Sequence, residues 1–471
     1  MTLSGTRSEC SWCFEPVCQS DLDSAAYPKL SPPAVGEHEE QIAQQLAVFL
    51  GRVARRPTME MLYSSCAGVD VHKDTVVVCV RRRDAKGKVQ QQTRTFGTMT
   101  GQLLALADWL AQEQVTHLAM ESTGVYWKPI WNLLEDQFQI LLVNAQHIKQ
   151  VPGRKTDVKD AEWIAQLLQH GLLKASFVPA TPQRHLRELT RQRRQLIQAK
   201  ASVANRIQKA LEDADVKLGS VASDVLGVSG RDMLRALIAG ETEPAALVEL
   251  ARRKLRAKIP ALRLALEGRV TEHHRFLLQL LLDELTHMEA LIGRLSARIV
   301  EVLPSSFGEA VERLATIPGI DERAAENILA EIGADMDQFP SAGHLASWTG
   351  MCSGNRESAG KRQSGKTTKG NRWLRATLVQ VAWAASHTKN TYLSAQYRRL
   401  ASRRGKKRAL VALGHTILVI IYHLLKKQTT YRELGPDYLD RLDTDRLTRN
   451  LIRRLERLGH KVTLQPQEPA A

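Results

Sequence analysis

The chain has 471 residues, which at roughly 100 to 200 residues per domain leaves room for about three domains. Its 66 Lys and Arg exceed its 50 Asp and Glu, which gives a net charge of +16. The leading class of partner is therefore a polyanion, either nucleic acid or an anionic membrane. With 43% hydrophobic and 25% charged residues, the composition argues against wholesale disorder, collagen and a multi-span membrane protein.

Residues 1–62 are mixed in character and are interpreted as an N-terminal extension. Cys10, Cys13 and Cys18 have the spacing of half a zinc site, but no matching Cys or His pair follows at finger spacing, so a zinc site there is not favoured. The other three cysteines stand singly, which indicates a reducing, cytosolic compartment. The N-terminus has no apolar core of a signal peptide, so no secretory signal is expected.

Residues 63–180 alternate between strand and helix patterns and predict a mixed α/β domain. Three strands are expected to form an antiparallel meander, at residues 66–71, 75–80 and 89–96. Helices and strands then alternate: a helix at 101–112, a strand at 117–121, a helix at 126–136, a strand at 140–144 and a helix at 158–170.

Residues 181–305 are helical in period and strongly charged. Two long stretches, about 184–218 and 262–303, contain few helix breakers and enough apolar repeats to pair as an antiparallel hairpin or coiled coil. This region is interpreted as a spacer or dimerisation arm.

Residues 306–430 predict a helical C-terminal domain, followed by a tail at 431–471. Leu314 to Gly333 looks like a helix-hairpin-helix element, whose Pro-Gly turn would present N–H groups to a DNA phosphate; the alternative is a turn that only packs. Ala409 to Leu425 is apolar but short and is interrupted by Gly414, His415 and His423. We expect a buried core helix there, not a membrane span.

Four carboxylates stand where metal-assisted phosphodiester chemistry would need them, because each Mg²⁺ takes oxygen ligands from distant parts of a chain. Asp70 lies in an otherwise apolar strand, and Glu121 ends a later strand before a Ser-Thr-Gly turn. Asp157 and Asp160 fall on one face at the start of a helix. Each could instead be structural, as a helix cap or a first-turn acid, but together they form the pattern of a ribonuclease-H-like nuclease.

A strongly basic stretch follows Gly350. Between Arg356 and Arg408 there are fifteen Lys or Arg and one acid, Glu357, which predicts contact with a phosphate backbone. Ser358 stands in this Gly-rich, cationic loop, where it could be a nucleophile or a linker serine. The candidate phosphate-binding residues are Arg356, Lys361, Arg362, Lys366, Lys369, Arg372 and Arg375.

These motifs resemble one known family. Asp70, Glu121, Asp157 and Asp160, in the contexts Gly-Val-Asp-Val-His-Lys, Glu-Ser-Thr-Gly-Val-Tyr-Trp and Lys-Thr-Asp-Val-Lys-Asp-Ala, are similar to the acids of DEDD transposases of the insertion-sequence one-hundred-ten and eleven-eleven group. Asn355-Arg-Glu-Ser-Ala-Gly-Lys-Arg and Lys369-Gly-Asn-Arg-Trp-Leu-Arg resemble that family's C-terminal transposase domain. The resemblance covers about residues 65–430. The sequence departs from the common family motif at Ala359, where many members have Gly.

The resemblance implies a RuvC-like domain whose four acids hold Mg²⁺, a helical connector that oligomerises, and a C-terminal domain in which Ser358 forms a covalent link to DNA. Ser353 and Ser364 are rival nucleophiles. It further implies that the RuvC-like domain of one protomer meets the serine domain of another, in a dimer or tetramer. A bridge RNA would select donor and target DNA, and the protein would be cytoplasmic and nucleoid-associated, without a membrane partner.

The sequence therefore predicts a transposase that excises and inserts its own element by Mg²⁺-dependent strand cleavage and rejoining. The alternative enzyme is a metal-dependent, structure-specific nuclease of the Holliday-junction-resolving kind, without a serine nucleophile. An actin-like ATPase or sugar kinase is disfavoured because no Gly-rich phosphate loop follows the later strands. A non-enzymatic binding protein is disfavoured because all four acids are present.

Overall fold

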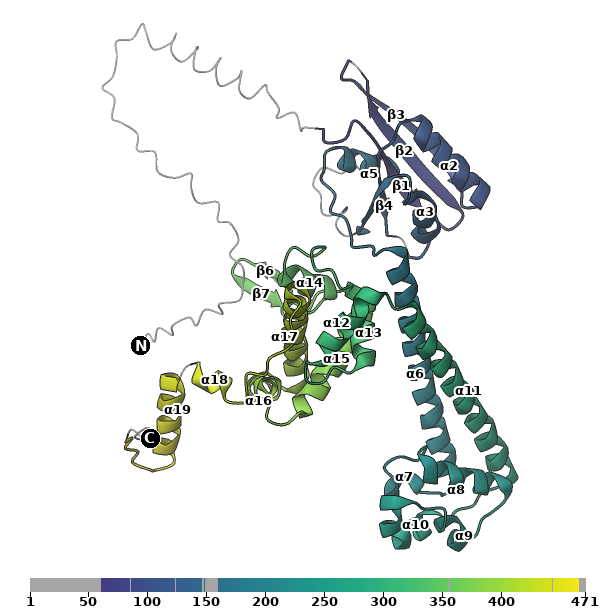
Figure 1. The fold of residues 1–471 in the computed structure, drawn as a ribbon, viewed down its shortest axis with the longest axis vertical. Helices are drawn as coiled ribbons and strands as arrows, with labels where there is room; N and C mark the ends of the chain where they lie inside the picture. The colour runs from purple at the N-terminus through teal and green to yellow at the C-terminus, as the bar shows by residue number, and fades with distance from the viewer. Residues whose placement is uncertain are drawn as a thin grey trace. The chain divides into compact units, whose positions relative to one another are not determined.

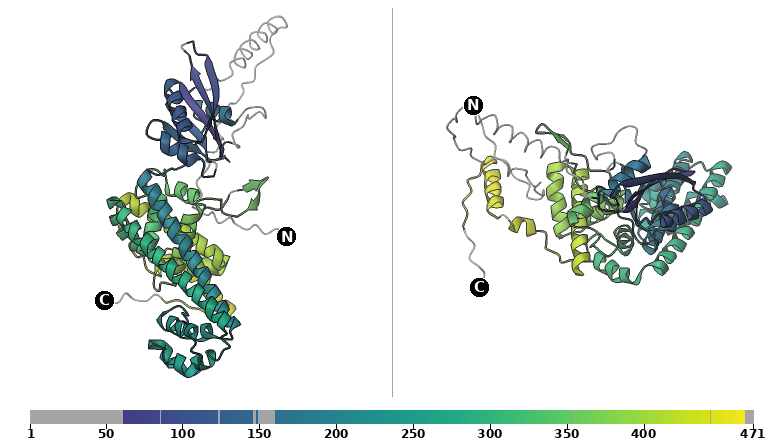
Figure 2. Two further views of the ribbon diagram at one scale, coloured as in Figure 1. Left: turned by 90° about the vertical axis from the view of Figure 1, so that its right-hand side faces the viewer. Right: turned by 90° about the horizontal axis from the view of Figure 1, so that it is seen from above.

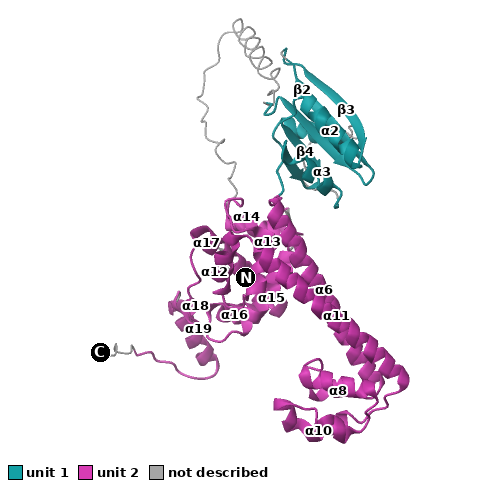
Figure 3. Cartoon of the chain, turned by 45° about the vertical axis from the view of Figure 1, so that its right-hand side comes forward, with its two compact units in different colours: residues 1–176 teal, residues 177–471 magenta. Residues whose placement is uncertain are grey.

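The computed structural model describes residues 61–84, 86–122, 124–145, 148, 160–354, 356–442 and 444–465 (Figures 1 and 2). Of the sequence predictions, the extension up to residue 60 with its three cysteines, Asn355 and the candidate acid Asp157 lie outside these residues. The chain divides into two compact units, residues 1–176 and 177–471, coloured teal and magenta in Figure 3.

The first unit is built on a five-stranded sheet in the order β3-β2-β1-β4-β5. Its strands are β1 (Ser65–Val71), β2 (Thr75–Arg83), β3 (Val89–Gly97), β4 (His117–Glu121) and β5 (Gln139–Val143). The first three strands pair antiparallel, and β4 and β5 run parallel to β1. The predicted meander and the two later strands are confirmed, and strand order and direction agree with a ribonuclease-H-like sheet.

Helices cover both faces of this sheet (Figures 1 and 2). They are α2 (Thr100–Gln112), α3 (Trp127–Leu134) and α5 (Asp160–Gln169). Along β1 the residues Ala67, Val69 and Val71 are fully buried on one face, and Cys66 packs with α5 on the other. A strand buried on both sides explains why the sequence of β1 is apolar throughout except at Asp70.

The second unit begins with an arm of two long helices, α6 (Thr181–Asp213) and α11 (Glu272–Val302), which lie side by side (Figure 1). Ion pairs join them, with Arg206 Nη2 2.9 Å from Glu284 Oε1 and Lys200 Nζ 2.7 Å from Glu289 Oε1. The partner numbers fall along α11 as they rise along α6, so the predicted antiparallel pairing is observed.

The ends of the predicted arm helices are wrong by several residues. The first helix ends at Asp213, because Asp215 has a left-handed backbone with φ 58°. The second begins only at Glu272, after a non-helical stretch in which a Cβ on Gly268 would lie 2.6 Å from the Ala214 carbonyl oxygen. This close packing of two loops, which needs a glycine, replaces the helix that the periodicity predicts there.

Short helices form the tip of the arm. They are α7 (Leu218–Val221), α8 (Val228–Ala239), α9 (Pro244–Val248), the 3₁₀ helix η1 (Arg253–Lys258) and α10 (Ile259–Ala265). The tip has a hydrophobic core of its own, in which Leu218, Met233, Leu247 and Leu262 are fully buried against Val203 and Leu285 of the arm.

The rest of the second unit is a helical bundle with a second core. Its helices are α12 (Ser305–Ala315), α13 (Glu322–Ile332), α14 (Ala342–Thr349), α15 (Arg372–His387), α16 (Tyr392–Arg404) and α17 (Lys406–Lys427), followed by α18 (Tyr438–Arg441) and α19 (Thr444–Arg457). Among the described residues, α17 is the one helix long and apolar enough to cross a membrane. Its residues Leu413, Ile417 and Ile421 are fully buried in the bundle core, as expected for the core helix that the sequence predicts.

Candidate active site

Strand β1 presents Asp70 on the face that α5 covers. A Cβ built on Gly68 would lie 2.9 Å from Ala165 Cα, and Cys66 Sγ lies 3.7 Å from the Ala165 carbonyl oxygen. Because side chains alternate along a strand, Asp70 faces the same way as Cys66 and Gly68. The missing side chain of Gly68 thus lets α5 lie directly on β1 and fixes the position of the helix relative to Asp70.

Glu121 is the neighbour of Asp70 on the adjacent parallel strand. Gly68 pairs with Ala119 and Val69 with Met120, so the next positions along the two strands are Asp70 and Glu121. Ala119 packs in the same hydrophobic cluster as residues of α5, which places the half-buried Glu121 on the α5 side. The two acids therefore meet at the carboxyl ends of β1 and β4, the edge where sheets of this kind bind ligands.

Asp160, the first residue of α5, adds a third acid near this edge. Burial raises the pKa of Asp70, and the negative charge of Asp160 raises it further, against the opposing effect of His72. His72 Nε2 lies 3.2 Å from Asp70 Oδ2, and the Asp70 side chain is 19% exposed. A carboxylate that is half buried beside a second carboxylate is electrostatically suited to a cation.

The acids of this edge offer the hard oxygen donors that divalent cations prefer. Asp70 and Asp160 fit such an ion, because each carboxylate raises the free energy of the other in its charged form and a cation would relieve this repulsion. Within the described ranges, however, no three His, Cys, Asp or Glu side chains lie close enough together to hold a metal.

In the second unit, Ser358 ends the first strand of a hairpin between α14 and α15. The strands are β6 (Arg356–Ser358) and β7 (Lys361–Ser364), and Ser358 pairs with Lys361. Ala359 and Gly360 between them both have positive φ, 50° and 71°. Positive φ at both central residues is the signature of a tight type I′ turn. Ser358 therefore lies at the tip of the hairpin, next to a strained alanine where glycine would be relaxed.

The predicted phosphate-binding cations lie on this hairpin and on the helix after it. Lys361, Lys366, Lys369 and Arg372 are exposed and Arg375 is half-buried, whereas the side chains of Arg356, Arg362 and Ser358 lie outside the described part of the structure. The Arg372 guanidinium lies 4.9 Å from the centre of the Trp373 ring, an arrangement that orients a cation at the start of α15.

Two glycines let the ends of the hairpin loop cross. A Cβ on Gly370 would lie 2.6 Å from the Thr349 carbonyl oxygen, and one on Gly350 would lie 2.7 Å from the Thr368 carbonyl oxygen. The next residue, Asn371, caps α15, since its Oδ1 accepts hydrogen bonds from the backbone N–H groups of Trp373 and Leu374 at 3.0 and 3.1 Å. The loop between these crossing points is thereby fixed at its base.

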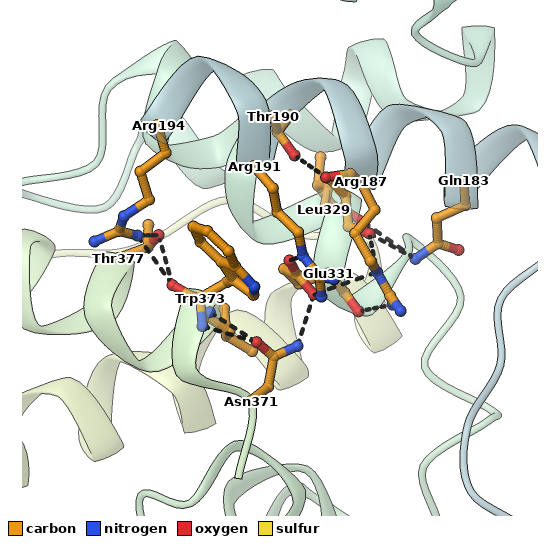
Figure 4. Close-up of polar contacts among 12 residues, drawn as sticks. Gln183, Arg187, Thr190, Arg191, Arg194, Leu329, Glu331, Asn371, Trp373 and Thr377 are labelled. Atoms are coloured by element: carbon orange, nitrogen blue, oxygen red, sulfur yellow. Dashed lines mark hydrogen bonds and ion pairs between the residues drawn. The ribbon is translucent and has the colours of Figure 1, made fainter. Parts of the chain in front are cut away.

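A buried carboxylate, Glu331 of α13, holds this base to the arm (Figure 4). Its side chain is 3% exposed and accepts two hydrogen bonds from Arg191, at 2.7 and 2.8 Å, and one from Asn371 Nδ2 at 2.6 Å. Arg187 Nε lies 3.2 Å from the same carboxylate. Glu331 thus connects α6, α13 and the cap of α15 through charge-assisted hydrogen bonds.

The expected helix-hairpin-helix element forms as α12, a tight turn and α13, and its turn packs against the bundle. A Cβ on Gly319 would lie 2.8 Å from the Val381 carbonyl oxygen of α15. Asp321 caps α13 by accepting a hydrogen bond from the Ala324 N–H at 2.8 Å. Because a phosphate there would compete with the Asp321 carboxylate, the packing alternative is the better supported, and the DNA contact stays a prediction.

Sequence reasoning missed three residues that shape these sites: His72, Gly68 and Glu331. His72 stands in the quoted Val-Asp-Val-His motif and could have been found from its position two residues after Asp70. Gly68 faces the same side of the strand as Asp70 and also carries a signal, since glycine inside a strand often marks a close approach. Glu331 carries no signal of this kind.

The fold and these two sites define an enzyme class that acts on the nucleic-acid backbone, with acids at a sheet edge and a cationic serine hairpin. Residues 67–214 match a DEDD family model described as Transposase, and residues 311–399 match the model described as Transposase IS116/IS110/IS902 family. The transposase for insertion sequence element IS1111A of Coxiella burnetii (strain RSA 493 / Nine Mile phase I) is 24% identical over 372 residues, which cover 78% of this chain and 90% of the relative. The chain belongs to the IS110 family of transposases, enzymes that cleave and rejoin DNA. This confirms the family resemblance that the motifs carry.

Proposed function

We propose that this transposase excises and inserts its insertion sequence through Mg²⁺-dependent cleavage and a covalent serine–DNA link. The observation that carries the proposal is the register of β1 and β4, which makes Asp70 and Glu121 neighbours on the face where α5 begins with Asp160. Burial, together with the negative charge of Asp160, raises the pKa of Asp70, which supports a role in holding a cation.

Asp70, Glu121, Asp157 and Asp160 would hold the metal. Bound there, Mg²⁺ would neutralise charge that develops on the phosphate oxygens during strand cleavage. The protein's own part is to keep these carboxylates at a rigid edge, with α5 fixed on β1 through Gly68. His72, 3.2 Å from Asp70, would orient the carboxylate by a hydrogen bond.

Ser358 is the nucleophile in this proposal. Its Oγ bonds to phosphorus as the bond from phosphorus to one bridging oxygen breaks; the serine gives up its proton and the leaving oxygen takes one up. A free hydroxyl of another DNA end then attacks the phosphoserine and releases the serine. The tip position of Ser358 supports this role over Ser364, which pairs with Arg356 at the far end of the strands, and over Ser353, which is bridged to Thr367.

The cations around the hairpin would hold the phosphate backbone during this exchange. These are Arg356, Lys361, Arg362, Lys366, Lys369, Arg372 and Arg375. On the strength of the family resemblance, we extend the proposal to a bridge RNA as guide and to a homo-oligomer held by the arm, in the cytoplasm beside the nucleoid. Residues 63–180 would be the nuclease domain, 181–305 the dimerisation region and 306–430 the serine domain.

The test uses the purified full chain with co-expressed RNA, Mg²⁺ and labelled element-end DNA on a denaturing gel. Wild type is compared with Ser358→Ala, Asp70→Ala and the matched serine control Ser364→Ala. We expect a covalent protein–DNA adduct with wild type and Ser364→Ala, and none with the other two.

Cleavage without an adduct, persisting in Ser358→Ala, would overturn the serine mechanism in favour of a metal-only nuclease. An adduct lost in Ser364→Ala and kept in Ser358→Ala would move the nucleophile to the base of the hairpin. Cleavage that continues after removal of divalent ions with a chelator would refute the metal part.

A further inference from the structure

We propose that the tip of the arm is a second nucleic-acid-binding site, which grips a phosphodiester backbone independently of the serine hairpin. The tip is formed by α7 to α10 at the end of α6 and α11 that lies away from the bundle core (Figure 1). Its separate hydrophobic core means that the tip is a small folded body with a surface of its own. No part of the proposed chemistry uses it.

The charge at this surface is strongly positive. Between Arg252 and Arg263 there are six Lys and Arg and no Asp or Glu. Arg253, Lys254 and Arg256 are exposed, and none of these three side chains has a hydrogen bond or ion pair within the described part of the chain. By contrast, Arg206 of α6 has an acidic partner in Glu284. A run of unpaired cations repels itself and is stabilised by a polyanion.

Two of these cations, Arg253 and Lys254, border a hollow of about 420 Å³. One wall is formed by Arg252 with Arg253, Lys254 and Lys258 of η1, and another by residues 227–230 at the start of α8. The N-cap of α8, Gly227, offers no side-chain cap, so the hollow is also bordered by first-turn amides. Positive charge thus comes from two walls and converges on one concave surface.

The hollow contains one acid, Asp224, whose carboxylate is already engaged. Its Oδ1 accepts a hydrogen bond from the Leu226 N–H at 3.0 Å. The cationic wall is anchored, since the Arg252 N–H donates to Ser229 Oγ at 2.9 Å and its guanidinium donates to Asp232 at 2.8 Å. Lys258 Nζ donates to the Val221 carbonyl oxygen at 2.9 Å. Arg252 and Lys258 therefore fix the ends of the run, and Arg253, Lys254 and Arg256 between them stay available.

Arg253 has an unusual backbone for a non-glycine residue, with φ 52°. A left-handed conformation costs an L-residue roughly 1 kcal/mol or more, and such strain is concentrated at functional sites. A glycine or asparagine would satisfy the turn at lower cost. An arginine held there, exposed and without a partner, is consistent with selection for its charge.

The dimensions fit a nucleic-acid strand. Three residue steps along a 3₁₀ helix, from Arg253 to Arg256, span about 6 Å at a rise of about 2 Å per residue. One strand of B-DNA carries a phosphate about every 3.4 Å along the axis, so the available cations match about two phosphates. DNA and RNA share this backbone chemistry, and the experiment separates them.

The test measures binding by fluorescence anisotropy with the full chain, without divalent ions so that no cleavage occurs. The probes are a labelled DNA duplex and a labelled single-stranded RNA, each at a series of salt concentrations. The tip variant Arg253→Gln/Lys254→Gln is compared with wild type and with a control variant, Lys209→Gln/Arg294→Gln. The control removes two exposed cations from α6 and α11 of the same arm. Because all four residues are exposed, both variants should fold, which circular dichroism checks.

For a duplex we expect the slope of log K against log salt to become shallower by about 2 in the tip variant, since each lost phosphate contact removes about 0.9. The control should retain the wild-type slope. A larger loss of affinity with RNA than with DNA would assign the site to RNA, and the reverse would assign it to DNA. Slopes unchanged in the tip variant with both probes, or changed equally in the control, would overturn the proposal. Failure of the serine mechanism would leave this result untouched, because the assay measures binding alone.

Discussion

Replacing Glu331 by Gln removes the one negative charge from a buried cluster that holds two arginines. The Glu331 side chain is 3% exposed, that of Arg187 14% and that of Arg191 31%. Glutamine keeps one acceptor oxygen for Arg191 or Asn371, but it leaves both guanidinium groups without a counter-charge. The perturbation therefore tests whether this carboxylate stabilises the junction of α6, α13 and α15.

The expected loss is about 3 kcal/mol. Removing one partner of a buried ion pair costs roughly 3–5 kcal/mol, because the remaining charge stays desolvated. We take the lower end because Arg191 is about a third exposed and can regain some hydration. The loss is measured by hydrogen exchange of the α13 and α15 amides, because a protein of two units does not unfold in a single global transition. A loss of about 3 kcal/mol corresponds to roughly a 100-fold loss of protection against exchange.

The matched control is Glu284→Gln. Glu284 also accepts two hydrogen bonds from one arginine, Arg206, both at 2.9 Å, but its side chain is 36% exposed. We expect its loss to cost less than about 1 kcal/mol, as for other surface pairs. Equal effects of the two substitutions, or a loss below about 1 kcal/mol at Glu331, would refute the argument from burial.

Three further changes have defined outcomes. Gly68→Ala should push α5 off β1, lower stability by about 1–3 kcal/mol in thermal unfolding and reduce DNA cleavage. The hydrogen bond from Arg231, together with Lys200, lowers the pKa of Glu289 to about 2. The contribution of Glu289 to stability is therefore complete above about pH 4.5 and is lost as the pH falls toward 2. In acid unfolding followed by circular dichroism, Glu289→Gln should lack this pH-dependent loss of stability. Ala359→Val should reduce the joining of DNA strands, because a β-branched residue is disfavoured at a backbone φ of 50°.

Two of these changes have a matched control, and Glu289→Gln is compared with wild type. Gly101→Ala, in α2, has no neighbour within 4 Å of the added Cβ and should be neutral or stabilising. Ala359→Gly should relieve the turn and preserve joining. Stability that is unchanged in Gly68→Ala, identical acid titrations of wild type and Glu289→Gln, or full joining by Ala359→Val would each contradict the corresponding reasoning.

Much of the first unit could be predicted from the sequence because its strands are apolar or, in β3, alternate Gln and Thr, and because clear turns separate them. The apolar run along β1 also identified Asp70 as an anomalous charge in a buried strand. Its closeness to Glu121 follows once the order of the strands is known, since parallel neighbours end at one edge. The direct packing of α5 on Gly68 could not be predicted, because it depends on the distance between two backbones.

The second unit was less predictable, for a different physical reason. Apolar periodicity shows that α6 and α11 are helices but is insensitive to where they end, which is decided by Asp215 and by the approach of Gly268 to Ala214. In the sequence, Glu331 looks like any other acid near the end of a helix, so its buried contacts could not be predicted. Its arginine partners lie about 140 residues earlier in the chain, and local patterns carry no information on such a pairing.

The Glu331 cluster lies at the base of the cationic hairpin loop, where it can offset the free-energy cost of ordering that loop. The hairpin and its flanks carry many positive charges that repel one another, so the loop gains little from its own contacts. The fold fixes the loop at its base instead, where Gly350 and Gly370 cross and Asn371 begins α15. A buried ion cluster often contributes no more stability than apolar residues of equal volume, but Glu331 is satisfied only when Arg187, Arg191 and Asn371 all reach it. Such a cluster is therefore best explained by orientation: it fixes the direction in which the loop leaves the bundle.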